Sequence, residues 1–375
     1  MKTFWILLLA IILSCKKNNQ PNDSTPISKG YELFFAFDSL KQATGYDIQI
    51  HPIIFDYNNN GKYDLIICRK TQSRTATTYT YELLNPIVIL DDKRIIELPS
   101  LWKGGSTFAV ADFNGDKLKD IAIMDNGPEY WDLNPNPPKT PLTVYWNSNS
   151  GLTGSNTIVK QMTNGCFNIN TVDADKDGVF EIIPMGNQFE DFSYEFNGGT
   201  FIKTEITNMK NISHTPAIYG DFNKDGNADV FAYGYDVSGN GNISVAKPAI
   251  ISNINSPNNT AVVNLPTDCF INILLDGDFD KNGFTDFIAI VRLQGPGGIP
   301  LNNNHYLFYI ENKGNNQYVT HTNKLPEFIV PSFNGYPMAY TSKDIDFDGD
   351  PDFYNINSSF NIFYLNNNGV FKEGL

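Results

Sequence analysis

The stretch DFNKDGNADVFA (221–232) contains the pattern on which most of this sequence is built. Positions 1, 3, 5 and 9 of its first nine residues are Asp or Asn, position 6 is Gly, and strand-forming residues follow at once. We find six copies of this pattern and number them loop 1 to loop 6. They are DYNNNGKYD (56–64), DFNGDKLKD (112–120), DADKDGVFE (173–181), DFNKDGNAD (221–229), DFDKNGFTD (278–286) and DIDFDGDPD (344–352).

Each loop has oxygen-bearing side chains at alternate positions, which in a tight turn can all face one ion. Ca²⁺ is a hard cation that prefers roughly six to eight oxygen ligands. Glycine, at position 6 in five loops and at position 4 in loop 2, permits the sharp turn. A single Asp/Asn–Gly turn needs no metal, but six copies in one register favour up to six calcium sites. The predicted ligands are Asp56, Asn58, Asn60, Asp64, Asp112, Asn114, Asp116, Asp120, Asp173, Asp175, Asp177, Glu181, Asp221, Asn223, Asp225, Asp229, Asp278, Asp280, Asn282, Asp286, Asp344, Asp346, Asp348 and Asp352.

The residues that follow each loop separate this pattern from an EF-hand. An EF-hand begins similarly but requires an acidic residue at position 12 and flanking helices. Position 12 is not acidic in any copy, being Ile67, Ile123, Pro184, Ala232, Ala289 and Asn355 in order. Because strand formers follow each loop, the predicted unit is strand–loop–strand.

The chain is acidic, with 27 Lys and Arg against 41 Asp and Glu and a formal net charge of −14. This balance argues against a nucleic-acid partner, whose phosphates require a basic surface. The predicted ligand positions hold 19 of the acidic residues, and six Ca²⁺ ions would change the charge from −14 to −2. Loop 1 has only Asp56 and Asp64 as carboxylates, and we expect it to be the weakest site.

The repeated loop resembles the FG-GAP/VCBS repeats of the integrin α-subunit propeller and of many bacterial surface proteins, over roughly residues 45–375. A second feature of these repeats, an aromatic strand that ends in an Asn-rich turn, follows three of the loops. It occurs at TVYWNSNSG (143–151), LFYIENKGNN (307–316) and IFYLNNNG (362–369), and it is missing after loops 1 and 4. The resemblance implies a β-propeller with calcium-binding loops.

Short aromatic and β-branched runs between Asn, Gly and Asp clusters independently indicate an all-β fold. The loops start 56, 61, 48, 57 and 66 residues apart, which leaves room for about four strands in each repeat. We therefore predict a β-propeller of six blades, with seven as the alternative, and a metal loop between strands A and B of each blade. Residues 31–38 are predicted to form an additional strand that closes the ring, so that the propeller domain covers 31–375.

The N-terminus has the pattern of a targeting segment. The apolar run at 4–13 is shorter than the roughly 20 residues that span a membrane, and it fits the hydrophobic region of a signal peptide. Ile12-Leu13-Ser14-Cys15 resembles a bacterial lipobox, which implies a signal peptide at 1–14 and acylation of Cys15. Residues 15–30 are polar and suit a flexible tether. Lys16 stands where Asp would indicate inner-membrane retention, so an outer-membrane lipoprotein of the cell envelope is expected.

The predicted function is binding of a glycan or a protein partner at the cell surface, as in adhesion, with the lipid anchor as the contact to the membrane. In integrins the face opposite the metal loops binds ligand, and the resemblance places the candidate site there. The candidate anchors on that face are Trp102, Tyr130, Trp131 and Tyr336, because exposed aromatic residues stack on sugars and anchor interfaces. We find no catalytic motif, but a polysaccharide lyase or glycoside hydrolase on a propeller scaffold is the alternative.

Overall fold

The computed structural model of the 375-residue chain describes the residues between 53 and 374 in segments. These are 53–74, 79–98, 107–124, 140–148, 151–162, 166–186, 192–206, 212–235, 247–254, 259–265, 269–294, 300–322, 325, 332–333, 336–337, 340–356 and 361–374. The predicted signal peptide, Cys15, the tether and residues 31–38 lie outside these segments. No helix occurs in the described segments, and hence none there is long and apolar enough to cross a membrane.

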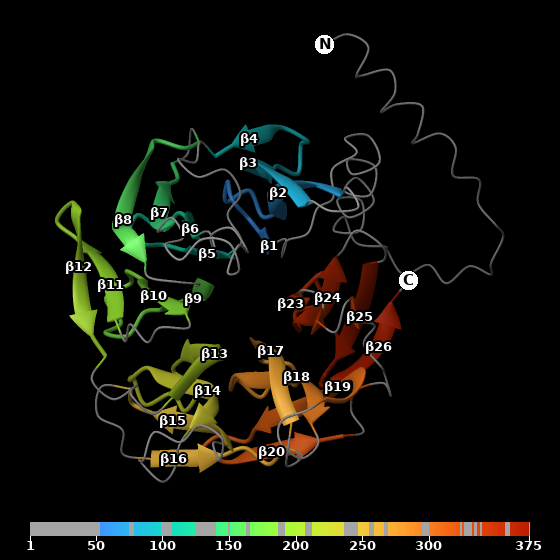
Figure 1. Cartoon of the computed structure of the whole chain (residues 1–375). Helices are drawn as coiled ribbons and strands as arrows, with labels where there is room; N and C mark the ends of the chain where they lie inside the picture. The colour runs from blue at the N-terminus through green and yellow to red at the C-terminus, as the bar shows by residue number, and fades with distance from the viewer. Residues whose placement is uncertain are drawn as a thin grey trace.

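Six four-stranded antiparallel sheets are arranged as the blades of a closed propeller (Figure 1). Each blade is formed by four strands that are consecutive in the sequence. In the five blades formed by residues 107–374, the first strands contact one another in succession around the centre of the ring. The predicted all-β propeller of six blades is therefore confirmed, and the seven-bladed alternative is wrong for this chain.

The strand bounds show how each repeat builds one blade. Blades 1 to 3 comprise β1 (Ile53–Phe55), β2 (Asp64–Arg74), β3 (Tyr79–Ile89), β4 (Ile95–Glu97); β5 (Thr107–Ala111), β6 (Asp120–Met124), β7 (Thr140–Trp146), β8 (Gly154–Met162); and β9 (Cys166–Val172), β10 (Glu181–Gly186), β11 (Phe192–Asn197), β12 (Thr200–Glu205). Blades 4 to 6 comprise β13 (Ile212–Gly220), β14 (Asp229–Tyr235), β15 (Lys247–Ser252), β16 (Asn259–Val262); β17 (Cys269–Gly277), β18 (Asp286–Gln294), β19 (Pro300–Asn312), β20 (Tyr318–His321); and β23 (Tyr340–Lys343), β24 (Asp352–Ile356), β25 (Asn361–Asn367), β26 (Val370–Gly374). A short hairpin, β21 (Ser332–Phe333) and β22 (Tyr336–Pro337), lies between blades 5 and 6.

The apolar core is divided among the interfaces between blades. Six clusters of buried residues each join two neighbouring blades, and the set closes the ring between blade 6 and blade 1. In that last cluster, Ile345 and Tyr354 of blade 6 pack with Ile54, Leu65 and other residues of blade 1. Since burial of apolar surface is the main stabilising term in folding, the ring is held by packing between successive blades.

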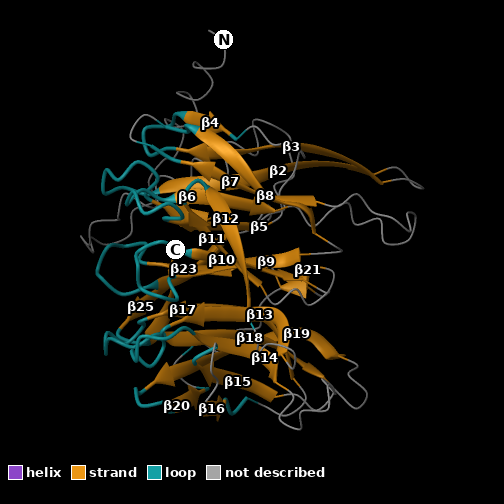
Figure 2. Cartoon of the chain, turned by 90° about the vertical axis from the view of Figure 1, so that its left-hand side faces the viewer, coloured by secondary structure: helices purple, strands orange, loops and turns teal. Residues whose placement is uncertain are grey.

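All six loops lie where the sequence placed them, between the first and second strands of a blade. Position 9 of each loop is the first residue of the second strand. The described loops gather on one side of the molecule (Figure 2). We call this side the metal-loop face, because it bears all 24 predicted ligands.

Candidate metal centre

The backbone of all six loops has the same two left-handed residues. Position 6 has a φ between 70° and 96° in every loop, and position 4 has a φ between 54° and 78°. Glycine adopts this conformation without steric cost, which explains Gly at position 6 in five loops. In loop 2 the Gly is at position 4 instead, and Lys117 adopts the strained conformation at position 6 with a φ of 70°. Loop 2 thus has the same backbone conformation as the other loops, although its Gly is at position 4 instead of position 6.

Repeated hydrogen bonds hold the side chains at positions 3 and 5 toward the loop interior. In every loop the position-3 Oδ1 accepts the backbone N–H of position 5. The position-5 Oδ1 likewise accepts the backbone N–H of position 7. In loop 4 these bonds measure 2.9 Å for Asn223 and 2.8 Å for Asp225. The oxygens are therefore oriented by the loop's own backbone.

The position-9 carboxylates are buried at the base of each loop, with at most 7% exposure. In Asp120, Oδ2 accepts the N–H of Phe113 at 3.1 Å and Oδ1 accepts that of Asn147 at 2.8 Å. Burial raises the pKa of Asp120 to about 7 although these hydrogen bonds oppose the shift. The pKa values of Asp286 and Asp352 are raised to about 7 for the same reason. A bound cation would favour the ionised forms of these groups.

The position-1 carboxylates separate the loops into two groups. In loops 3 to 6 one oxygen accepts the N–H of the position-6 Gly. The other oxygen is buried and accepts no hydrogen bond from any residue that the structure describes; these atoms are Oδ1 of Asp173, Asp221, Asp278 and Asp344. A buried carboxylate oxygen without a partner is costly, so this atom fits a cation ligand.

Loops 1 and 2 satisfy their position-1 carboxylates internally. Asp56 accepts the N–H groups of Asn60 at 3.0 Å and Gly61 at 2.7 Å, one on each oxygen. In loop 2, Asp112 Oδ1 accepts the N–H of Gly115 at 2.7 Å, and Oδ2 accepts that of Lys117 at 2.7 Å. The geometry therefore fits a cation better in loops 3 to 6 than in loops 1 and 2.

Carboxylate spacing distinguishes three of these four loops. In loops 3, 5 and 6, three carboxylate oxygens lie within 4.8 Å of one another. The three sets are Asp173, Asp175 and Asp177; Asp278, Asp280 and Asp286; and Asp344, Asp346 and Asp348. So many hard oxygen donors, of which one in each loop is buried and unpartnered, match the ligands that Ca²⁺ prefers.

Sequence reasoning missed three asparagines that connect loops 1, 4 and 5 to the blade that follows each of them. Asn147, Asn312 and Asn366 are buried at the ends of their third strands. Each side-chain amide donates to the position-2 carbonyl of the preceding blade's loop. The acceptors are Tyr57 O at 2.6 Å, Phe222 O at 2.9 Å and Phe279 O at 2.7 Å, respectively. The three asparagines lie in the three Asn-rich turns noted in the sequence. The turns were therefore recognised, but their contacts with a neighbouring blade were not predicted.

Two acidic residues outside the nine-residue pattern also lie at the loops. Asp91 accepts hydrogen bonds from Asn60 Nδ2 and Lys62 Nζ of loop 1, both at 2.8 Å. Glu311 is 4% exposed and lies beside Asp280 of loop 5, where burial and this second carboxylate raise the pKa of Asp280. Glu311 also contacts Lys313 and lies 2.6 Å from His321 Nε2. The nine-residue pattern does not predict either residue, because both come from the third strand of a blade or from the turn that follows it.

The predicted ligand-binding anchors are not brought together in the described part of the chain. Trp102, Tyr130 and Trp131 lie outside the described residues. Tyr336 is in β22, paired with Phe333 through the backbone, and its side chain lies outside what the structure describes.

The fold and the loops define a six-bladed propeller with a ring of carboxylate-rich loops on one face. No protein-family model matches the chain, and no curated protein matches it. Among solved structures it is similar to the V. cholerae biofilm matrix protein Bap1, with 16% identity, a TM-score of 0.39 and coverage of 74% of this chain and 40% of that chain. It is also similar to the exotype rhamnogalacturonan lyase YesX, with 12% identity, a TM-score of 0.42 and coverage of 88% and 56%. A third is the Bacillus licheniformis rhamnogalacturonan lyase PL11, with 14% identity, a TM-score of 0.42 and coverage of 86% and 72%.

These similarities concern the fold alone. The chain spans less than two thirds of the length of the first two proteins, and with TM-scores below 0.5 no functional argument is drawn from any of the three. The FG-GAP/VCBS repeat type accordingly stays a resemblance based on the loop residues.

Proposed function

We propose that this protein is a calcium-stabilised propeller that binds a glycan or a protein partner at the cell surface, where a lipid on Cys15 anchors it. The buried, unpartnered position-1 oxygens of loops 3 to 6 support the calcium part most directly. The lipobox-like Ile12–Cys15 segment supports the anchor. The partner would bind the face opposite the metal-loop face, where the connections are expected to present Trp102, Tyr130, Trp131 and Tyr336.

Calcium would be held by positions 1, 3 and 5 of each loop together with position 9. When bound, the ion supplies a positive charge that offsets repulsion among carboxylates within 4.8 Å of one another. The residues themselves already fix the loop through the Asx-type hydrogen bonds described above. Loops 3 to 6 are therefore expected to bind calcium more tightly than loops 1 and 2.

Metal analysis and thermal unfolding test the calcium part. We expect about four tightly bound Ca²⁺ ions, and a melting temperature that falls by about 10 °C or more on chelation, because a ligand that binds only the folded state stabilises it by mass action. Asp344→Asn in loop 6 should remove one ion, whereas Asn58→Ala in loop 1 should leave the tightly bound number unchanged. A melting temperature insensitive to chelator, with fewer than three ions bound, would contradict calcium binding.

A glycan and surface-protein screen tests the binding part, followed by Trp131→Ala and Trp102→Ala in the protein that binds. An interface anchor truncated to Ala typically loses about 2 kcal/mol or more of binding free energy with little change in melting temperature. A core Trp would instead lose about 3–5 kcal/mol of folding stability. Loss of stability with binding intact would remove these residues from the site. Release of unsaturated oligosaccharides from a bound glycan, measured by ultraviolet absorbance, would replace binding with lyase activity.

A further inference from the structure

The side chain at position 4 connects five of the six loops to the next loop around the ring. This position lies between two predicted ligands and has a left-handed backbone in all six loops. Its contacts always run in the same direction, from one loop to the next. They join Asn59 to Lys117 O at 3.3 Å, Lys176 to Asp221 at 2.8 Å, Lys224 to the Phe284 ring at 4.9 Å, Lys281 to Asp348 O at 3.2 Å, and Phe347 to Tyr63 at 4.8 Å between ring centres. In loop 2 position 4 is Gly115, which has no side chain to make such a contact.

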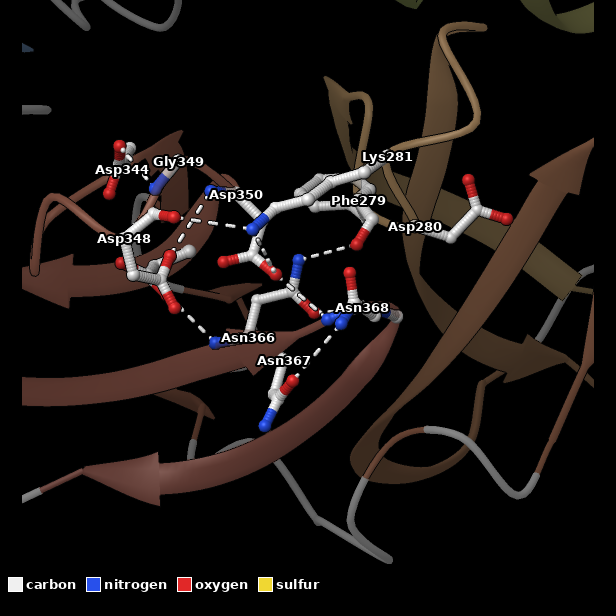
Figure 3. Close-up of polar contacts among 12 residues, drawn as sticks. Phe279, Asp280, Lys281, Asp344, Asp348, Gly349, Asp350, Asn366, Asn367 and Asn368 are labelled. Carbon is white, nitrogen blue, oxygen red and sulfur yellow. Dashed lines mark hydrogen bonds and ion pairs between the residues drawn. The ribbon is translucent and has the colours of Figure 1, made fainter.

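The joint between loops 5 and 6 contains a buried charge that the nine-residue pattern does not explain. Asp350, at position 7 of loop 6, is 1% exposed, and its Oδ2 accepts the N–H of Asn368 at 2.8 Å. Its Oδ1 has no hydrogen-bond partner among the described residues. Lys281 reaches across from loop 5, and its Nζ lies 3.6 Å from Asp350 Oδ2 (Figure 3). Lys281 is thus the counter-ion that loop 5 provides for a buried carboxylate of loop 6.

The same lysine is fixed between two ligand positions of its own loop. Asp280 and Asn282 flank Lys281 in the sequence, so a cation held by those two side chains restrains the intervening backbone. On the other side, Lys281 Nζ donates to the carbonyl of Asp348, whose carboxylate is a predicted ligand in loop 6. A cation in loop 5 would therefore hold Lys281 where its ammonium group donates to the carbonyl of Asp348 and lies beside the carboxylate of Asp350.

We propose that Lys281 couples the cation sites of loops 5 and 6, so that a cation in one loop raises the affinity of the other. This inference rests on the proposed calcium binding and adds a positioning residue to it. By linkage the effect is reciprocal, so it can be measured at loop 5 while loop 6 is altered. Lys224 is the matched control, because it occupies the same position in loop 4 but its ammonium group faces the Phe284 ring instead of a carboxylate.

Tyr309 makes loop 5 separately observable. Its hydroxyl donates to Asp286 Oδ2 at 2.7 Å, so a Tb³⁺ ion held by Asp286 would be close enough to be excited through this ring. The part of the Tb³⁺ emission that is lost in the Tyr309→Phe variant measures the occupancy of loop 5. Titration of the full chain with Tb³⁺, with and without this change, gives the midpoint for that site.

The decisive experiment weakens loop 6 and reads loop 5. In the otherwise unchanged protein, Asp344→Asn should raise the Tb³⁺ midpoint of loop 5 about fivefold, the lower end of typical coupling. In a Lys281→Met background the same change should leave the midpoint unaltered, and in a Lys224→Met background the fivefold shift should persist. Asp346→Asn replaces Asp344→Asn if circular dichroism shows that the latter does not fold.

Two outcomes would overturn the coupling while leaving calcium binding intact. An equal shift in the Lys281→Met and Lys224→Met backgrounds would mean that the loops interact without Lys281. No shift in any background would mean that the two sites are independent. Absence of Tb³⁺ and Ca²⁺ binding by the unaltered protein would instead overturn the proposed function, and this inference with it.

Discussion

At the residue scale, the position-9 carboxylates link the loops to the stability of the fold. Burial raises the pKa values of Asp120, Asp286 and Asp352 to about 7, from an ordinary value of 3.8. Between these values the folded state binds more protons than the unfolded state. The stabilisation of the folded state that comes from these bound protons is therefore fully present below about pH 4 and is lost as the pH rises through about 7.

The first prediction is a pH dependence that calcium reverses. In chelator, the melting temperature should fall between pH 5 and pH 8, because these carboxylates must then ionise while buried and without a cation. In excess Ca²⁺ it should rise over the same range, because the cation binds the ionised form and competes with the protons. Differential scanning fluorimetry across this range checks both trends. A flat or rising profile in chelator would contradict the raised pKa values.

The second prediction concerns the displaced glycine of loop 2. Lys117 is exposed and has a φ of 70°, a conformation that costs a non-glycine residue about 1–2 kcal/mol. Lys117→Gly should therefore raise the free energy of unfolding by about 0.5–1 kcal/mol, after the entropy cost of glycine. Lys119→Gly, two residues on and also exposed, is the control and should lower stability. Equal effects in urea denaturation would show that the backbone at position 6 carries no strain.

At the scale of elements, the third strand of a blade contributes more than a pairing partner. A residue at its C-terminal end, or within two residues beyond it, places a backbone N–H on the position-9 carboxylate in five blades. In blades 2, 4, 5 and 6 that residue is Asn, and in blades 2, 5 and 6 its amide also connects to the preceding blade. One residue thus joins the loop of its own blade, through its backbone N–H, to the preceding blade, through its side chain.

The third prediction tests this connection in blade 6, where a control lies next in sequence. Asn366→Ala removes the amide that donates to Phe279 O at 2.7 Å and leaves a buried carbonyl without that donor (Figure 3). We expect a loss of about 1–3 kcal/mol in the free energy of unfolding. Asn367→Ala, at an exposed position, should change it by less than about 0.5 kcal/mol. Equal values for the two variants would show that the contact between blades contributes nothing.

At the scale of the whole molecule, the excess of acidic over basic residues lies in the loops of the metal-loop face. The six loops contain 20 acidic residues and six lysines, and this difference of 14 equals the formal net charge of −14 for the entire chain. The rest of the sequence is therefore balanced in charge. Loading the loops with cations would remove most of the field of the metal-loop face without altering any other surface.

The fourth prediction places the molecule in the cell. If Cys15 is acylated, the mature protein should fractionate with the outer membrane and release Cys15-linked lipid on analysis by mass spectrometry. Cys15→Ser should remove the lipid, so the variant should be recovered outside the membrane fraction. A Cys15→Ser protein that stays in the membrane with its lipid content unchanged would show that the anchor lies elsewhere.

Much of this molecule could be predicted from the sequence, because the decisive interactions are local. Ligand positions 1, 3, 5 and 9 and the left-handed glycine are set within nine residues, and strand formers follow each loop. Six such units of even spacing determined the all-β class, the blade number and the place of each loop in its blade. Loop 2 kept the same backbone although its Gly is displaced, since the register of its oxygens is unchanged.

Only the tertiary structure decided which groups meet between blades. The Asn amides bond to carbonyls 87 to 90 residues away, and Lys281 reaches Asp348 across 67 residues. The unpartnered oxygens that distinguish loops 3 to 6 from loops 1 and 2 also follow from folded geometry, because all six loops have Asp at position 1. A repeat pattern specifies what each unit contains, but contacts between units depend on how closure of the ring orients neighbouring blades.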